Sequence, residues 1–528
     1  MSDTDLSKTL IRAAKRAETS SECVLEQAFV PVGSLMAHLQ SSDHHVLFGR
    51  RGTGKTHVLR YLRQEKIADG QLAVYVDLRR IGSPEDIYSA NQEDFLPQAT
   101  ALLVDVVESI HGSICDQVLA DSWGDRLERV SAGLDALAAA ATRIRVVGEV
   151  EIERQQEERS DSGRSAEMAL AVSRDPGASV TVGRRAERSK RHLERTVSRG
   201  RESHHVLLGP LSAAIQTIAE AIAPDELWLL VDEWSALPLE VQPLMADLLR
   251  RTFLATGGVV VKISAVHGRS VFQSADTAVG LELGADTAAS LDLDDFLLFR
   301  NDAAATMDFY ADLLFRHVSA IAGRLGVSEK DRLRRLTSPT ALTRELFADE
   351  ASFHHLVLGA EGVPRDALQI AALAAGMAYG RPIGSTQVAN ATRDFYLRDK
   401  ERQLPRQAHE VFTNLIEHCA RQKSRIIPLR RKGESNEKVI QRLYDARLIH
   451  RVRQGVSLDP QHPSDVYDVY VIDYGCFLGL ITAGRIRTSE DGLDPGARFA
   501  DSNEVEIRGR AFVRMAPGWY RRPPQRRP

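Results

Sequence analysis

The chain has 528 residues, which exceeds what one hydrophobic core supports and predicts about three or four structural units. Apolar residues make up 43% and charged residues 27%, an ordinary balance for a globular protein, and the formal net charge is only −4. The chain as a whole is therefore not a general binder of polyanions, and any nucleic-acid surface must come from local clusters of basic residues.

Neither a disulfide framework nor a membrane anchor is predicted. The four cysteines are scattered and form no CxxC pair, so a structural zinc site is not expected either. Residues 1–20 contain no apolar core of a secretory signal, and no run approaches the ~20 apolar residues that span a bilayer. We expect a cytoplasmic protein without a membrane partner.

The first part of the chain alternates between strand and helix patterns. Residues 1–40 are predicted to form a helical lead-in, and the apolar run 44–48 a buried strand that ends at Gly49. The segments that follow are an amphipathic helix, a second buried strand and a mostly helical stretch, over 56–63, 72–78 and 94–139.

Residues 140–205 differ from what surrounds them. Short alternating runs are separated by Ser, Gly and Asp-Pro-Gly signals, and the stretch from Arg184 to Arg201 is strongly basic. We interpret this segment as an insertion that is partly mobile. Its arginines form either a solvated loop or a nucleic-acid contact.

Regular alternation resumes after the insertion, with helices over 207–223 and 238–255 and strands over 227–231, 259–266 and 288–293. Strands that alternate with helices predict a mostly parallel, three-layer α/β sheet. Residues 303–400 are predicted to be all-helical, residues 401–480 to be helices followed by two strands, and the tail 521–528 to be disordered.

The segment 49–56, GRRGTGKT, satisfies the P-loop pattern G-x-x-x-x-G-K-[ST]. Glycines let the backbone curl so that several N–H groups point at phosphate oxygens, and the following helix adds its positive N-terminal end. We expect ATP, with Lys55 at the β- and γ-phosphates and the Thr56 hydroxyl on Mg²⁺. The predicted nucleotide-binding residues are Gly49, Arg50, Arg51, Gly52, Thr53, Gly54, Lys55, Thr56 and His57.

A second motif supplies carboxylates for the metal. The apolar run 227–231 ends in Asp232 and Glu233. Asp232 is expected to bind Mg²⁺ through water, and Glu233 to polarise the attacking water as a general base. The alternative is a strand that ends in solvated acids. Kinase, ABC-type and helicase patterns fit the chain less well.

With these motifs, the chain resembles an AAA+ ATPase of the origin-recognition-complex type. The resemblance rests on FVPVG, GRRGTGKT, LLVDEW, VVVKISA, GVPRDAL and a C-terminal winged-helix pattern. The chain is also similar to a bacterial group of such ATPases, found with mobile elements and defence loci, in which GRRGTGKT and VYVIDYG recur. The resemblance implies a P-loop domain, a helical lid and a C-terminal winged helix.

The resemblance also implies roles for single residues. Ser264 would be a sensor-1-like residue at the γ-phosphate or the attacking water, where the family usually has Asn. Arg365 would be sensor 2 on the lid helix, and residues 29–32 would lie near the adenine. An arginine finger donated to a neighbouring subunit implies a homo-oligomer; the candidates are Arg269 or, alternatively, Arg250 or Arg251.

Residues 419–453 are strongly basic. A helix with Val439, Ile440 and Leu443 on its inward face, followed by a two-stranded hairpin, is typical of a winged helix. When such a domain binds DNA, the helix enters the major groove and the hairpin contacts phosphates. The alternative is a protein-docking module with solvated arginines. The predicted contacts to double-stranded DNA are Lys438, Arg442, Arg447, Arg451 and Arg453.

We therefore expect a slowly hydrolysing ATP switch that couples its nucleotide state to DNA or partner binding, in a mobile-element or defence context. The alternative is a nucleotide-dependent signalling or defence scaffold that recruits an effector protein without binding DNA. The predicted domains are a lead-in over 1–40, an ATPase core over 41–300 with an insertion at about 140–205, a helical lid over 301–400, a winged-helix-like domain over 401–485, and an extension over 486–528 with a basic tail.

Overall fold

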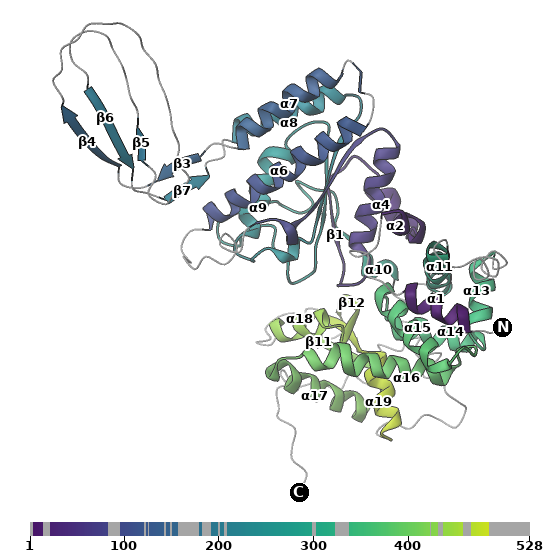
Figure 1. The fold of residues 1–528 in the computed structure, drawn as a ribbon. Coiled ribbons are helices and arrows are strands. Elements are labelled where there is room, and N and C mark those ends of the chain that lie inside the picture. Colours follow the sequence, from purple (N-terminus) through teal and green to yellow (C-terminus); the bar gives the residue numbers. More distant parts are fainter. Residues whose placement is uncertain are drawn as a thin grey trace.

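The fold was obtained as a computed structural model (Figure 1). It describes residues 4–13, 22–82, 95–120, 123–124, 126–141, 208–297, 303–322, 337–422, 424–430, 437–457 and 466–484, together with the strands 144–147, 150–156, 179–181, 192–198 and 201–204 of the inserted segment. The predicted extension over 486–528 lies outside these residues. None of the described helices is long and apolar enough to cross a membrane.

A five-stranded parallel sheet forms the centre of the ATPase core. Its strand order is β10-β1-β9-β8-β2, and every adjacent pair is parallel. Parallel strands covered by helices on both faces read as continuous apolar runs, as in LWLLV at residues 227–231. The predicted α/β sheet is confirmed. Its strands are β1 (His45–Phe48), β2 (Leu72–Asp77), β8 (Leu227–Asp232), β9 (Val259–Ser264) and β10 (Leu291–Asp292).

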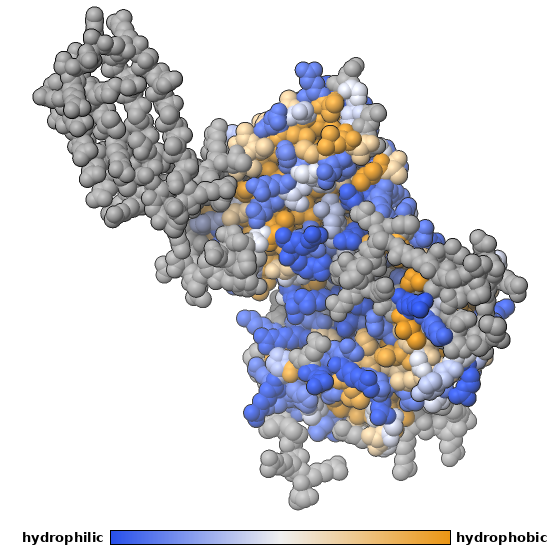
Figure 2. Space-filling view, viewed as in Figure 1, coloured by the Kyte–Doolittle hydropathy of each residue, from blue (hydrophilic) through white to orange (hydrophobic). Residues whose placement is uncertain are grey.

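Helices cover both faces of this sheet (Figure 1). One face packs on α3 (Gly33–Leu39) and α4 (Lys55–Ala68). The helices on the other face are α6 (Leu96–Ala120), α7 (Arg126–Ala141), α8 (Leu208–Ile222) and α9 (Gln242–Leu249). The stretch 94–139, predicted to be mostly helical, is thus two helices. On the surface, apolar residues gather over α6 and α7 (Figure 2), where Leu96, Leu119 and Leu127 are exposed.

The last strand of the sheet is shorter than predicted. The sequence indicated a strand over 288–293, but β10 has only two residues because α10 (Leu293–Leu297) begins directly after it. The carboxylate of Asp292 accepts a hydrogen bond from the backbone N–H of Asp294 at 2.9 Å, which satisfies one of the unpaired donors at the start of this helix.

The described residues of the inserted segment form short antiparallel strands, as the alternating sequence pattern indicated. They form one pair, β3–β7, and one three-stranded sheet of order β4-β6-β5. The strands are β3 (Ile144–Val147), β4 (Val150–Gln156), β5 (Ser179–Thr181), β6 (His192–Ser198) and β7 (Arg201–His204).

A bundle of helices follows the sheet and forms the lid. Its helices are α11 (Ala303–Ala322), α13 (Pro339–Leu346), α14 (Glu350–Ala360), α15 (Pro364–Ala378) and α16 (Ser385–Phe395). The first helix of the chain, α1 (Thr4–Ala13), belongs to the same bundle, because Leu6 and Leu10 are buried in the lid core. The predicted lead-in therefore completes the lid in space, although it lies some 300 residues earlier in the chain.

Residues 406–484, here named the C-terminal module, form a small mixed domain. Its elements are α17 (Arg406–Gln422), β11 (Ile426–Arg430), α18 (Glu437–Asp445), β12 (Ile449–Ser457), β13 (Val466–Ile472) and α19 (Tyr474–Thr482). The predicted helix and hairpin are present, but the sequence prediction missed β11. This strand contains Pro428 and lies at the edge of the antiparallel order β11-β13-β12, where the missing N–H of proline is tolerated.

Gly133→Ala is expected to destabilise the ATPase core by about 1–3 kcal/mol, because it overpacks the contact between α7 and α8. A Cβ on Gly133 would lie 2.6 Å from Ile218 Cγ1 and 3.2 Å from Ile218 N. The matched control is Gly112→Ala in α6, where a Cβ meets no atom within 4 Å. Alanine favours helices, so the control should gain about 0.5–1 kcal/mol. Urea unfolding that shows the same change for both variants would contradict this packing.

Candidate nucleotide site

The P-loop connects the buried strand β1 to helix α4, as the sequence predicted. Gly52 and Gly54 have φ values of 94° and 103°, which only glycine adopts without strain. A Cβ on Gly52 would also lie 3.0 Å from Val363 Cγ1 and 3.1 Å from Arg365 Cβ. The glycines thus allow both the curl of the loop and its close packing against the start of the lid helix α15.

The ammonium group of Lys55 lies inside the curl of the P-loop. Its Nζ donates hydrogen bonds to the carbonyl oxygens of Gly49 and Arg50, at 2.7 and 3.0 Å. Burial lowers the pKa of Lys55. An anionic phosphate is the kind of group that stabilises such an ammonium group. Lys55 therefore fits the contact with the β- and γ-phosphates that the motif predicts.

Asp232 ends β8 and is almost fully buried, with 1% of its surface exposed. Its Oδ1 accepts hydrogen bonds from the Ser264 hydroxyl and, at 2.9 Å, from the Glu233 N–H. Its Oδ2 accepts from the Tyr75 hydroxyl at 2.6 Å. Burial and the Asp232 charge raise the pKa of Tyr75, so this phenol stays protonated and donates. The carboxylate is held in one orientation by three donors from three neighbouring segments.

Glu233 lies at the opening of this cluster. Its backbone is in the left-handed region, with φ 60°, and its N–H also donates to Ser264 Oγ at 3.1 Å. Its carboxylate lies 3.4 Å from Arg79 Nη1 and is partly exposed. Burial, followed by the charge of Asp232, raises the pKa of Glu233. A carboxylate with a raised pKa is a better proton acceptor than an ordinary one, which suits a general base.

The residues at this site fit a magnesium–nucleotide complex. Thr56 lies in the first turn of α4, directly after the P-loop. Asp232 ends β8, which lies two positions from β1, the strand that leads into the P-loop. A hydroxyl and a carboxylate are hard oxygen ligands of the kind that Mg²⁺ prefers, and Mg²⁺ usually keeps several of its waters. Because the Asp232 oxygens already accept protein hydrogen bonds, the arrangement favours a contact through water.

Tyr75→Phe is expected to destabilise the protein by about 1.5–3 kcal/mol, because it removes a donor from a buried carboxylate. The matched control is Tyr379→Phe, since Tyr379 is 86% exposed. Urea unfolding of both variants measures the difference. Equal stability of the two variants would show that the Tyr75 hydroxyl does not hold Asp232.

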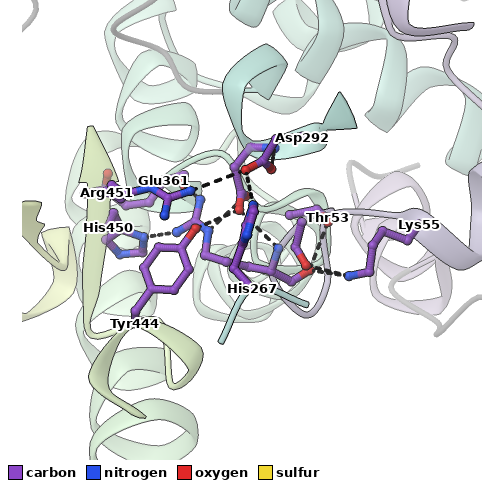
Figure 3. Close-up of polar contacts among 11 residues, drawn as sticks. Thr53, Lys55, His267, Asp292, Glu361, Tyr444, His450 and Arg451 are labelled. Atoms are coloured by element: carbon purple, nitrogen blue, oxygen red, sulfur yellow. Dashed lines mark hydrogen bonds and ion pairs between the residues drawn. The ribbon is translucent and has the colours of Figure 1, made fainter. Parts of the chain in front are cut away.

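Arg50 is a correction to the predicted phosphate-binding set. Its backbone N–H donates to Asp294 Oδ2 at 3.1 Å, and its side chain, only 2% exposed, pairs with Asp294 Oδ1 at 2.9 Å. The guanidinium also donates to the Glu361 carbonyl oxygen at 2.9 Å and contacts His450 Nδ1 (Figure 3). The side chain therefore points away from the curl of the loop and into the boundary with the C-terminal module.

Two further predicted residues lie beside the P-loop. Arg365 is at the start of α15, and its N–H donates to the Gly52 carbonyl oxygen at 3.2 Å. This position is compatible with the sensor-2 role, which stays a prediction. His57 is a correction, because its ring contacts the Leu25 carbonyl oxygen and the edge of Phe29 rather than the phosphate-binding curl. Arg51 is exposed.

The arginine-finger candidates all have partners within the chain. Arg269 pairs with Asp445 of α18. Arg250 and Arg251 both bind Asp247, each at 2.6 Å. All three side chains are nevertheless at least one-third exposed, and the arginine-finger role stays a prediction.

The predicted DNA-binding residues divide into two groups. Lys438 and Arg442 are exposed on α18, and Arg453 is half-buried. Arg447 instead pairs with Asp366 of the lid, and Arg451 lies 3.4 Å from Asp292 and over the Tyr444 ring. In this arrangement carboxylates of the lid and the core pair with these last two arginines, and their assignment to DNA stays a prediction.

Sequence reasoning missed Tyr75, Asp294 and His450. Tyr75 could have been found from the pairing of β2 with β8. This parallel pair places Asp77 opposite Asp232, and Tyr75 lies two residues before Asp77, on the same face of the strand. Asp294 and His450 carry no local signal, because they meet Arg50 only through pairing across 244 and 400 residues of chain.

Comparison with known proteins finds a family for the P-loop segment. Residues 12–82 match the family model described as ORC-CDC6-like. Among solved structures, the chain is similar to the ORC1 protein of Aeropyrum pernix in complex with DNA, with 13% sequence identity, 86% of this chain and 94% of that chain covered, and a TM-score of 0.31. No curated protein matches the chain.

The family match spans β1, the P-loop, α4 and β2, and so includes Lys55 and Thr56. Strand β9, which ends at Ser264, lies between β1 and β8 in the sheet, so Ser264 and Asp232 end neighbouring strands; the sensor-1 role of Ser264 stays a prediction. The ORC-CDC6-like match thus covers the P-loop segment, and the parallel sheet with helices on both faces is the α/β P-loop fold that the sequence predicted.

Proposed function

We propose that the chain is an ATP- and Mg²⁺-dependent molecular switch whose nucleotide state controls the engagement of double-stranded DNA by the C-terminal module. The observation that carries this proposal is the convergence of Lys55, Asp232 and Ser264 at the carboxyl edge of a parallel sheet. Ligands of open α/β sheets bind at this edge. A cytoplasmic location, a homo-oligomer and a mobile-element or defence context stay predictions from the sequence.

Each residue of the site has a distinct task in slow hydrolysis. Bound Mg²⁺ supplies positive charge to the phosphates, with Thr56 and Asp232 as the protein groups that hold it. Lys55 binds phosphate oxygens. Glu233 accepts the proton of the attacking water, and Ser264 orients Asp232 and senses the γ-phosphate. Arg365 brings the lid to the phosphates.

DNA binding is assigned to the C-terminal module, which we take to be a winged helix. Lys438 and Arg442 lie on the exposed face of α18, the helix that precedes the hairpin β12–β13. Basic residues on that helix suit a DNA backbone or groove, with an affinity that falls steeply with salt.

A second function, an effector-recruiting signalling or defence scaffold, is favoured by one observation. Arg447 and Arg451 are occupied by Asp366 and Asp292, which leaves a smaller basic surface for DNA. In that case the exposed face of α18 contacts a protein, and hydrolysis is dispensable.

Fluorescence anisotropy with labelled double-stranded DNA separates the two functions. Arg442→Glu is expected to lower DNA affinity about tenfold or more and to flatten its salt dependence, because it removes a phosphate contact and adds repulsion. The matched control is Arg406→Glu on α17, whose side chain is 95% exposed. Equal losses in both variants, or no DNA binding by the wild-type chain, would move the assignment to the scaffold.

A further inference from the structure

Three segments of the nucleotide site contact the C-terminal module. Arg50 of the P-loop reaches His450 of β12. The loop after β9, which follows the sensor-1 residue, supplies two contacts: Arg269 pairs with Asp445, and the His267 carbonyl oxygen accepts from Gln441 Nε2 at 2.7 Å. The remaining contact is at the start of the lid helix α15, next to Arg365.

That third contact is an ion pair between Asp366 and Arg447. The P-loop, the sensor-1 strand and the sensor-2 helix are the parts of an AAA+ site that respond to the γ-phosphate. All three therefore meet one module. Of the residues that make these contacts, Arg50 was predicted to bind the phosphates and Arg269 to be an arginine finger, and the others have no predicted nucleotide role.

Arg50 is the centre of this contact, because its side chain bonds to Asp294, Glu361 and His450. Asp294 binds Arg50 on one side and accepts from the Tyr444 hydroxyl at 2.9 Å on the other, so it joins the P-loop to α18. Burial holds the pKa of His450 well below its usual range, so its ring is neutral. Its Nδ1 then accepts from Arg50 while its Nε2 donates to Asp473 Oδ2 at 3.1 Å.

The chain of contacts continues into the lid. Lys400 lies 2.7 Å from Asp473 and 3.0 Å from Asp366, and all three side chains are buried. Partners in such a buried cluster are strongly interdependent, because a charge that loses its partner without reaching water is costly. The cluster therefore favours two discrete arrangements, closed or opened to water, over intermediate ones. We name it the Arg50 latch; its members are Arg50, Asp294, Asp366, Lys400, Tyr444, Arg447, His450 and Asp473.

We propose that the Arg50 latch couples the nucleotide site to the position of the C-terminal module, so that ATP binding favours its opening and frees Arg447 and Arg451. The proposal rests on the proposed function and adds the regulation of the same site. Its starting point is the backbone of Arg50: the Lys55 ammonium group donates to the Arg50 carbonyl oxygen at 3.0 Å, while the Arg50 side chain holds the latch.

A ligand that attracts Lys55 competes with that carbonyl oxygen and so acts on the residue at the centre of the latch. Opening also changes the basic surface. Arg447 and Arg451, which pair with Asp366 and Asp292 when the latch is closed, join Lys438 and Arg442 on the same module. The closed arrangement therefore weakens DNA binding without blocking it.

The test uses the full chain with Arg447→Gln, which removes one ion pair of the latch and touches no predicted nucleotide contact. Hydrogen exchange of the β12 amides reports docking, and calorimetry reports the affinity for ATP with Mg²⁺. Because coupling between two sites is reciprocal, a loosened latch is expected to speed exchange and to raise ATP affinity about fivefold or more. The matched control, Arg406→Gln on α17 of the same module, whose side chain is 95% exposed, should change neither quantity.

Faster exchange with unchanged or lowered ATP affinity would overturn the coupling, and unchanged exchange would show that the pair does not hold the module. Asp445→Asn, at the separate contact with Arg269, provides the same readout if Arg447→Gln does not fold. Failure of the wild-type chain to bind ATP would contradict the proposed function, whereas normal ATP and DNA binding with an unresponsive Arg447→Gln variant would contradict the latch alone.

Discussion

Lys55→Ala is expected to lower the affinity for ATP about 100-fold or more. A charged hydrogen bond contributes about 1.5–3 kcal/mol, and a loss of about 2.8 kcal/mol corresponds to 100-fold in affinity. Lys55 is the cation inside the P-loop curl, where its Nζ donates to the carbonyl oxygens of Gly49 and Arg50. Isothermal titration calorimetry with ATP and Mg²⁺ measures the change.

The matched control for this variant is Lys66→Ala on the same helix. The Lys66 ammonium group lies over the Trp228 ring at 4.3 Å and near Gln40, away from the P-loop. The control is expected to bind ATP like the wild type, even where it is less stable. Similar ATP affinities for Lys55→Ala and the wild type would show that the nucleotide, if bound, is not held by this loop.

Glu233→Gln is expected to lower kcat for ATP hydrolysis about 10²- to 10⁴-fold, the usual contribution of a general base, while ATP affinity changes little. The amide keeps the size of the side chain but cannot accept the proton. The exposed residue seven positions later provides the control, Glu240→Gln, which should hydrolyse ATP like the wild type. A variant that retains wild-type turnover would exclude Glu233 as the base.

The same residue predicts a pH dependence. A general base acts in its deprotonated form, so kcat/KM falls as the pH drops through the pKa of Glu233. Burial and the Asp232 charge raise that pKa, so the acidic limb of the profile lies above the usual range of a glutamate. An acidic limb at the ordinary glutamate pKa would contradict the geometry of the Asp232–Glu233 pair.

The parts predicted correctly from the sequence depend on local pattern. The run VVVKIS could only be a strand buried on both faces, and GRRGTGKT specified the curl between β1 and α4 through the φ values that its glycines allow. Asp232 was found because it ends an apolar strand, and the parallel sheet then brings that end to the P-loop. The ATPase fold and the centre of its site follow from such signals.

The contacts that the sequence did not predict depend on long-range pairing. Arg447 and Arg451 were assigned to DNA because their own segment holds few acids, but their partners Asp366 and Asp292 belong to the lid and the core. Arg50 was read as part of a phosphate cradle, although Asp294 takes both its N–H and its guanidinium. A local count of charge does not include a carboxylate that folding brings from another domain.

The central claim is that nucleotide and DNA binding are coupled, and titration of ATP into the full chain with and without saturating double-stranded DNA tests it most directly. Coupling is reciprocal, so DNA should tighten ATP binding by the same factor by which ATP tightens DNA binding, about fivefold or more. Identical ATP affinities in the presence and absence of bound DNA would contradict the account and leave a nucleotide site that does not control this surface.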